Sequence, residues 1–186
     1  MKVQATPVQG VLLLSPHIWR DDRGAFHESF HAERYRAAGI EGSFVQDNIS
    51  TSRYGVIRGL HFQHPHAQAK LVSAVHGSIF DVVVDVRIGS PTFGQWFGHE
   101  LSADAAEQIY VPAGCAHGFQ VLSSVAVFSY KCSAYYAPVH ERTIRWNDAE
   151  LGIDWPLPDA TLSPRDRAAE SLAEVRDRGQ LPPYVP

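Results

Sequence analysis

The chain has 186 residues, of which 45% are apolar, so it can bury the core of one domain. Its 16 basic and 20 acidic side chains give a formal charge of −4, which argues against a general nucleic-acid binder. No apolar run reaches the ~18 residues of a membrane span, and no secretory pattern opens the chain. Two cysteines are too few for a disulfide framework. We therefore expect a soluble, cytoplasmic protein.

Short apolar runs follow one another along the chain, and their β-branched and aromatic content favours strands. The expected strands are Val8–Leu14, Phe44–Ser50, Val56–Gln63, Lys70–Val75, Ser78–Arg87, Gln95–Leu101, Gln108–Val111, His117–Leu122, Val125–Tyr136 and Thr143–Trp146. In the run Ser78–Arg87, one face carries Phe80, Val82, Val84 and Val86, and the other carries Asp81, Asp85 and Arg87. This alternation predicts a half-buried strand.

Helical pattern is scarce. A short helix is expected over His31–Ala38, where Gly39 ends it, and a second over Pro164–Val175, where Ser163 can cap the first turn. The last residues, Leu181–Pro186, hold three prolines and should be extended. The fold class is therefore all-β, a single domain over 1–186 built as a sandwich or barrel, with a helical tail from about 163 to 186.

Two segments gather residues that can carry chemistry. Residues 55–70 contain Arg58, His61, His64, His66 and Lys70, and residues 110–119 contain the pattern P-x-G-x-x-H, which ends at His117. Together these segments resemble the two motifs of the cupin superfamily, whose β-jelly-roll barrels enclose a ligand. In the metal-binding members, H-x-H with a following Glu and a further His hold the ion.

The histidine spacing therefore raises the question of a metal. His64-Pro-His66 and His117 fit, but the position of the carboxylate ligand falls on or beside Lys70, and a divalent ion would repel that ammonium. Histidines that flank a proline also suit a turn better than a strand. We expect no metal, with His64 and His66 on a surface loop. The cations Arg23, Arg58, Lys70 and Arg165 are instead candidate partners of an anionic ligand.

Ten short segments, in chain order, together resemble one family. They are Asp22–Glu28 (read from Asp21), Phe44–Ser50, Gly59–Gln63, Ala67–Val72, Phe80–Arg87, Ser90–Gly94, Pro112–Phe119, Tyr130–Cys132, Tyr136–Pro138 with Glu141, and Leu162–Asp166. The chain is similar in these segments to the dTDP-4-dehydrorhamnose 3,5-epimerases of deoxysugar biosynthesis. The resemblance implies a cupin jelly-roll barrel with a few short peripheral helices.

The resemblance also implies a reaction. In a dTDP-linked 4-keto-6-deoxy-hexose, C3 and C5 both adjoin the C4 ketone, so their protons are weakly acidic. Epimerisation needs a base on one face, an acid on the other, and donors or cations for the enolate on O4, but no cofactor. By resemblance, His61 (whose ordinary pKa is about 6.5) is the base, Asp166 is its partner, Tyr130 is the acid, and Lys70 stabilises the enolate.

The resemblance also implies a set of substrate-binding residues. They are Arg23, Phe26, Glu28, Gln46, Asp47, Asn48, Arg58, His117, Tyr136, Glu141 and Arg165. The first six would bind the nucleotide, and some of them would come from the second subunit of a homodimer. The N-terminal arm of about 1–50 should therefore pack on the partner subunit. Phe26 could stack on the base. The family commonly has Lys where Arg165 stands, which keeps the charge but changes the geometry.

Several alternatives stay open. A mono-epimerase that acts at C3 or C5 only would share these motifs, and a metal-dependent cupin oxygenase or a non-catalytic sugar-nucleotide binder would share fewer. Arg58 and His61 would face opposite sides of a regular strand. Gly59 could supply a bulge that re-aims one of them, or Arg58 could lie in the preceding turn. The alternation from Phe128 to Tyr136 places Tyr130 and Tyr136 on one wall.

Overall fold

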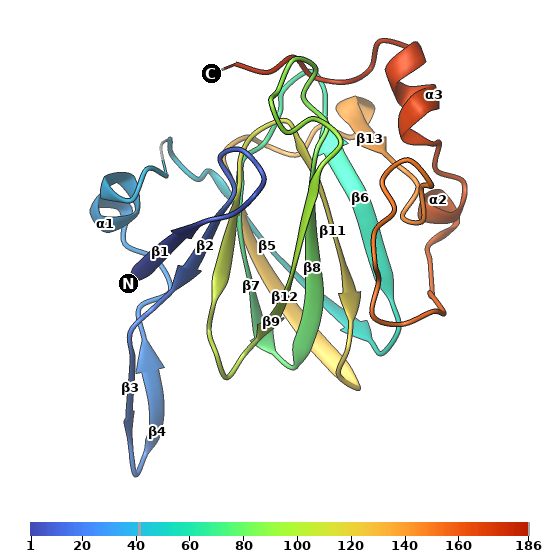
Figure 1. Ribbon diagram of the computed structural model, residues 1–186. Helices are drawn as coiled ribbons and strands as arrows, with labels where there is room; N and C mark the ends of the chain where they lie inside the picture. Colours follow the sequence, from blue (N-terminus) through green and yellow to red (C-terminus); the bar gives the residue numbers. More distant parts are fainter. Residues whose placement is uncertain (41, 186) are drawn as a thin grey trace.

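The computed structural model describes residues 1–40 and 42–185, so Glu41 of the expected arm and Pro186 of the expected tail lie outside the described residues. Two antiparallel sheets make up its main body (Figure 1). The first has the order β1 (Lys2–Ala5), β2 (Leu12–Ser15), β10 (Gln108–Val111), β7 (Lys70–His76), β12 (Val125–Cys132) and β5 (Gln46–Arg53). The second has the order β13 (Glu141–Thr143), β6 (Ile57–Gln63), β11 (Cys115–Val121), β8 (Ser78–Asp85) and β9 (Trp96–Ser102).

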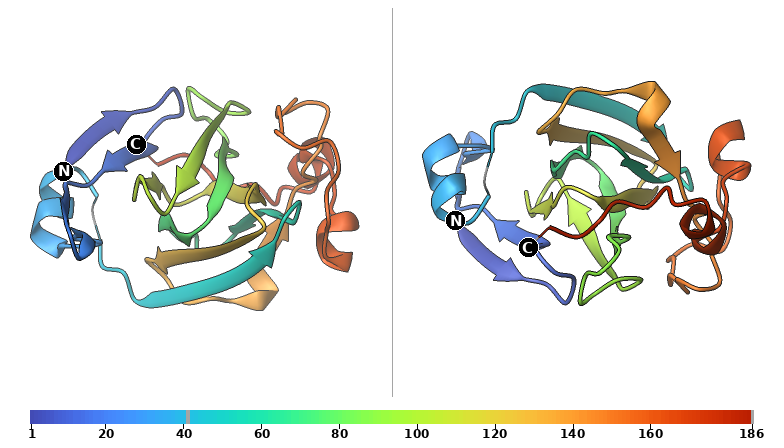
Figure 2. Two further views of the ribbon diagram at one scale, coloured as in Figure 1. Left: turned by 90° about the horizontal axis from the view of Figure 1, so that it is seen from below. Right: turned by 90° about the horizontal axis from the view of Figure 1, so that it is seen from above.

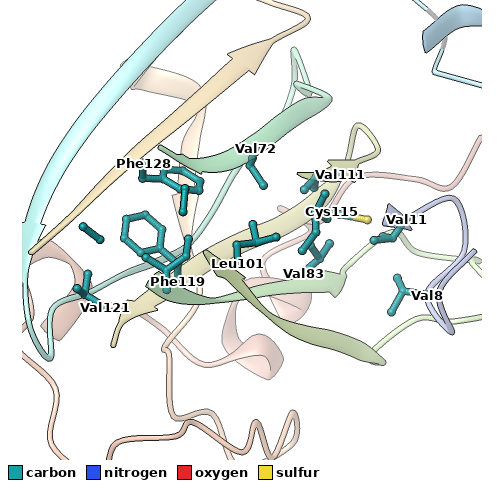
Figure 3. Close-up of a cluster of buried hydrophobic side chains, with 14 residues drawn as sticks. Val8, Val11, Val72, Val83, Leu101, Val111, Cys115, Phe119, Val121 and Phe128 are labelled. Carbon is teal, nitrogen blue, oxygen red and sulfur yellow. The ribbon is translucent and has the colours of Figure 1, made fainter. Parts of the chain in front are cut away.

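The two sheets face each other around a shared core, as the views along the strands show (Figure 2). Val72 and Phe128 of the first sheet pack with Val83 and Phe119 of the second in one buried cluster (Figure 3). Each large apolar side chain buried in this way stabilises the fold by about 1.5–3 kcal/mol. The all-β, two-sheet architecture predicted from the sequence is confirmed.

Strand β8 is buried on both faces. Val83 points into the core between the sheets, whereas Val82 and Val84 pack outward against Leu172 and Val175 of the C-terminal segment. The predicted alternation is confirmed, but the prediction of a half-buried strand is wrong because the C-terminal segment covers the outer face of the sheet (Figure 2).

The N-terminal region differs from the prediction. In place of one strand over Val8–Leu14, the chain forms β1 and β2, and Val8 is buried in the turn between them. A hairpin of β3 (Ile18–Asp21) and β4 (Gly24–His27) follows, which the sequence did not predict because each strand has only four residues and neither forms an apolar run. The hairpin projects away from the barrel (Figure 1).

The helices are short and peripheral. The predicted first helix is confirmed as α1 (Ala32–Ala37), where the His31 side chain caps the start and Gly39 has a φ of +87° after the end. A single 3-10 turn, η1 (Pro138–His140), precedes β13. Among the described residues, no helix has the length and apolar character needed to cross a membrane.

The predicted second helix is in fact two. Ser163 caps α2 (Pro164–Arg167) as expected, but Ser171 starts a separate helix, α3 (Leu172–Asp177), through a capping box with Glu174. The end of the described chain is extended, and Pro183 bridges to Ile88. The predicted helical tail of 163–186 is therefore helical only in part.

Candidate active site

A cavity of about 390 Å³ lies between the two sheets. Its lining residues are Gln46, Asn48, Ser50, Arg58, His61, Gln68, Lys70, His117, Phe119, Phe128, Tyr130, Cys132, Tyr136 and Glu141. Phe119 and Phe128 also belong to the core cluster, so the apolar core forms one wall of the cavity. Most of the polar residues that the sequence singled out meet here.

A β-bulge in β6 brings Arg58 and His61 to the same cavity. In the register with β11, His61 lies opposite His117 and Arg58 opposite Phe119, so Gly59 and Leu60 together face one residue, Gly118. The extra residue reverses the parity between Arg58 and His61. Of the two alternatives left open by the sequence, the bulge is confirmed, and the turn is wrong because β6 already begins at Ile57.

Glycine is required at the bulge. Gly59 has a φ of +136°, and a Cβ there would lie 2.6 Å from Cα of Gly118 and 3.0 Å from the carbonyl oxygen of His117. Both strands approach so closely that a side chain would collide with backbone. The guanidinium of Arg58 is then fixed by donation from Nε to Oγ of Ser52 over 3.0 Å.

The base candidate is paired as predicted. His61 Nε2 lies 2.6 Å from Oδ1 of Asp166, which is only 3% exposed. Burial would raise the pKa of Asp166, but hydrogen bonds from His61 and Ser163 and the nearby Arg165 charge hold that pKa below its usual value. Asp166 therefore stays a carboxylate that orients the imidazole. Since Asp166 engages Nε2, Nδ1 is the nitrogen that can take a proton from a substrate, and it lies 4.0 Å from Oε1 of Glu141.

Tyr136, Glu141 and Arg165 are bonded to one another at the rim of the cavity, beside His61. Tyr136 donates its hydroxyl to Oε2 of Glu141 over 2.5 Å, and the Arg165 guanidinium contacts the same oxygen. Burial raises the pKa of Glu141, yet these two hydrogen bonds outweigh it and leave the pKa lowered. Arg165 and Asp166 are adjacent in α2, so this one helical turn supplies both the cation of the rim and the partner of the base.

Lys70 and Tyr130 come from the opposite sheet. Burial lowers the pKa of the Lys70 ammonium, while the charges of Cys132, Glu141 and Asp81 act in the other direction. Tyr130 packs beside Phe128, and burial raises the pKa of its phenol, which therefore keeps its proton at neutral pH. Because β12 and β6 belong to sheets that face each other, Tyr130 and His61 approach the cavity from opposite sides.

The predicted nucleotide contacts on strand β5 point to opposite faces of the strand. Gln46 and Asn48 face the cavity and share a hydrogen bond of 2.9 Å. Asp47 points to the other side, where it forms an ion pair of 2.9 Å with Lys131. Tyr136 is anchored from here, since its backbone N–H donates to Oε1 of Gln46 over 2.8 Å.

Besides Asp47 and Arg165, three predicted contacts are absent from the cavity lining. Arg23 and Phe26 are on the β3–β4 hairpin, and Glu28, which follows it, is bound by Arg34 over 2.9 Å. A second hollow runs along the hairpin and is lined by Trp19, Asp21, Arg23, Gly24, Ala25 and Phe26. None of these residues lines the cavity that contains His61, and their role stays a prediction.

The histidines of the H-x-H pattern also lie away from the cavity. His64 and His66 occupy the turn after β6, and His66 has a φ of +67°. His117 does line the cavity, but its Nε2 is bonded to Oδ2 of Asp81 over 2.8 Å. In the part of the chain that the structure describes, no three His, Cys, Asp or Glu residues are arranged to hold a metal ion.

Sequence reasoning missed some lining residues. Ser50 shares a face with Gln46 and Asn48 by strand parity, so the alternation could have found it. Cys132 likewise shares the face of Phe128 and Tyr130, whereas Gln68 carried no such signal. Asp81 was placed on the polar face of its strand, and the structure shows that this face is buried beside the cavity.

Comparison with known proteins decides the family. The family model described as dTDP-4-dehydrorhamnose 3,5-epimerase matches residues 5–174. A protein of Pseudomonas aeruginosa with that name is 52% identical over 177 residues, which cover 94% of this chain and 98% of the relative. The chain belongs to the dTDP-4-dehydrorhamnose 3,5-epimerase family.

Solved structures agree with this family. A dTDP-6-deoxy-D-glucose-3,5-epimerase of Legionella pneumophila in complex with dTDP-4-keto-L-rhamnose matches with a TM-score of 0.95 and 48% identity, over 100% of this chain and 99% of that one. A dTDP-4-dehydrorhamnose 3-epimerase of Streptomyces niveus is 42% identical over 187 residues, which cover all of this chain and 90% of the relative. The family thus includes relatives named for one carbon as well as for two.

Proposed function

We propose that the protein epimerises a dTDP-linked 4-keto-6-deoxy-hexose at C3 and C5. It is an isomerase of deoxysugar biosynthesis, as its family is. The observation that carries the proposal is the pairing of His61 with Asp166 on one side of the cavity, with Tyr130 on the opposite side. A base and an acid that face each other across one cavity are what inversion at a carbon centre requires.

The chemistry follows from these positions. His61 Nδ1 removes the proton from the carbon next to the ketone, and the C–H electron pair moves into an enolate on O4. Lys70 and Arg58 stabilise this negative charge. Asp166 stabilises the imidazolium that forms. Tyr130 then returns a proton to the opposite face of the carbon, and the resulting phenolate and imidazolium exchange protons with solvent before the next event.

Solvent deuterium distinguishes one carbon from two. The purified protein is incubated in deuterium oxide with dTDP-4-keto-6-deoxyglucose, and the sugar is followed by proton NMR. We expect deuterium at both C3 and C5 and none with a His61→Asn variant. Uptake at one carbon only would assign the protein to the mono-epimerases, and no uptake by the wild-type protein would reject the proposal.

The nucleotide is proposed to bind between two subunits of a homodimer. The β3–β4 hairpin stands away from its own barrel (Figure 1). Its Trp19 and Phe26 side chains are 52% and 68% exposed, although their rings contact each other. Docked on a partner, the hairpin would bring Arg23, Phe26 and Glu28 to that partner's cavity. Exposed aromatic surface of this kind is typical of an interface.

Sedimentation tests the dimer. We expect a dimer mass for the wild-type protein and a weaker dimer with a raised KM for Phe26→Ala. A wild-type protein that sediments as a monomer at micromolar concentration would reject this part of the proposal. We also propose a cytoplasmic setting, because Cys115 and Cys132 are both free thiols.

A further inference from the structure

The buried carboxylate of Asp81 has no role in the mechanism so far. Asp81 lies on β8 and is fully buried, with 0% exposure. Its Oδ2 is bonded to Nε2 of His117 over 2.8 Å, whereas its Oδ1 has no hydrogen-bond partner among the described residues. A carboxylate oxygen left unpaired in the interior is costly, so its presence requires an explanation.

His117 connects Asp81 to the cavity. It is 6% exposed, lines the cavity, and lies directly opposite His61 in the register of β11 and β6. On one side its ring stacks on Phe128 with centroids 5.8 Å apart, and on the other Asp81 holds Nε2. These two contacts fix the ring, so Nδ1 is the nitrogen that His117 can turn to a ligand.

Lys70 connects Asp81 to the enolate site. Lys70 shares the cavity with the ionisable groups Arg58 and His61 of β6, His117 of β11, Cys132 and Tyr130 of β12, Tyr136, and Glu141 of β13. Asp81 of β8 stands directly behind His117, to which it is bonded. Two of these groups are carboxylates. Glu141 is already bound by the Arg165 guanidinium, which offsets its charge, but no Arg or Lys is paired with Asp81 in the described chain.

We propose that Asp81 is a positioning residue for the epimerisation, which aims His117 at the sugar and supplies the fixed negative charge that keeps Lys70 an ammonium. Its effect on turnover rests on the proposed function, but its effect on Lys70 does not. A buried ammonium tends to lose its proton, and a nearby negative charge opposes that loss. Burial lowers the pKa of Lys70, and the negative charge of Asp81 opposes that lowering.

The substitution Asp81→Asn isolates the charge. Asparagine keeps the shape and can still accept from Nε2 of His117 through its amide oxygen. The protein has three lysines, Lys2, Lys70 and Lys131, so labelling with [ε-13C]lysine gives three signals that can be followed by NMR as the pH is raised. The Lys70 signal is assigned by its loss in Lys70→Arg. Asp104→Asn, at an exposed site after β9, is the matched control.

We expect the titration midpoint of Lys70 to fall by roughly one pH unit in Asp81→Asn, while Lys2, Lys131 and the control variant stay unchanged. In activity assays, kcat should drop about tenfold with little change in KM, and the loss of activity at alkaline pH should begin about one unit lower. An unchanged Lys70 midpoint would overturn the proposal. So would a variant that fails to fold, because it would assign Asp81 to stability.

The two proposals fail separately. If the wild-type protein has no epimerase activity, the proposed function is rejected, but the Lys70 titration still tests whether Asp81 keeps Lys70 charged. If the wild-type protein is active and Asp81→Asn has the wild-type pH profile, only the role of Asp81 falls.

Discussion

Replacement of Gly59 by alanine tests how the β6 bulge builds the site. The new Cβ would meet Cα of Gly118 at 2.6 Å, and φ at this position is +136°, where residues other than glycine are strained. The backbone strain costs about 1–3 kcal/mol. The collision with backbone adds about 1–3 kcal/mol, because neither strand can move without displacing its neighbours. We expect Gly59→Ala to lose about 4 kcal/mol in total, or roughly 10 °C in Tm for a domain of this size.

Gly24 provides a matched control for stability. It has a similar φ of +129°, but a Cβ there has nothing within 4 Å. Gly24→Ala should therefore carry the backbone strain alone, so the difference between the two variants measures the collision. Gly59→Ala should also lose at least about 100-fold in kcat, because relief of the collision displaces Arg58 and His61 by an ångström or more. Equal Tm values for the two variants, or full activity of Gly59→Ala, would refute this account of the bulge.

Three further outcomes are expected. Asp166→Asn should lower kcat by about 10²–10⁴-fold, while dTDP binding measured by calorimetry is retained. His61 keeps its position in this variant but loses the negative charge that stabilises its imidazolium. Unchanged turnover would contradict this. Tyr130→Phe should still exchange substrate protons with deuterium oxide through His61 but should form little epimer, and normal epimer yield would exclude the phenol as the acid. Burial raises the pKa of Asp85, but hydrogen bonds from Arg87, Ser90 and Thr92 lower it below its usual value. The stabilisation by Asp85 is therefore complete above the unfolded pKa of about 3.9 and lost as pH falls through the folded pKa, so Asp85→Asn should flatten the acid limb of urea stability curves.

Local pattern was sufficient for much of the architecture. Alternation from Phe128 onward assigned Tyr130 to the wall of the cavity, because side-chain direction in a strand depends only on position along it. Tyr136 also lines the cavity, although β12 ends before it at Cys132. The caps of α1 and α2 were predicted for the same reason, since a cap depends on residues within one turn.

Contacts between residues far apart in the chain could not be predicted from local sequence pattern. The bulge at Gly59 exists only because β6 meets β11 at Gly118, and periodicity within β6 does not contain that register. Burial of the outer face of β8 depends on Leu172 and Val175, nearly a hundred residues later in the chain. The pairing of His61 with Asp166 was predicted only through resemblance to a family, because 105 residues separate the two.

The origin of Asp166 has a consequence for control of the enzyme. The base stands on the barrel, but its partner lies on α2, a single turn on the outside that contacts β6 and follows the bridge between Thr161 and Val56. Short segments of this kind open locally far more often than the sheets beneath them. Each opening would separate Asp166 from His61 while the cavity stays assembled. A ligand that held α2 in place would therefore act as an activator.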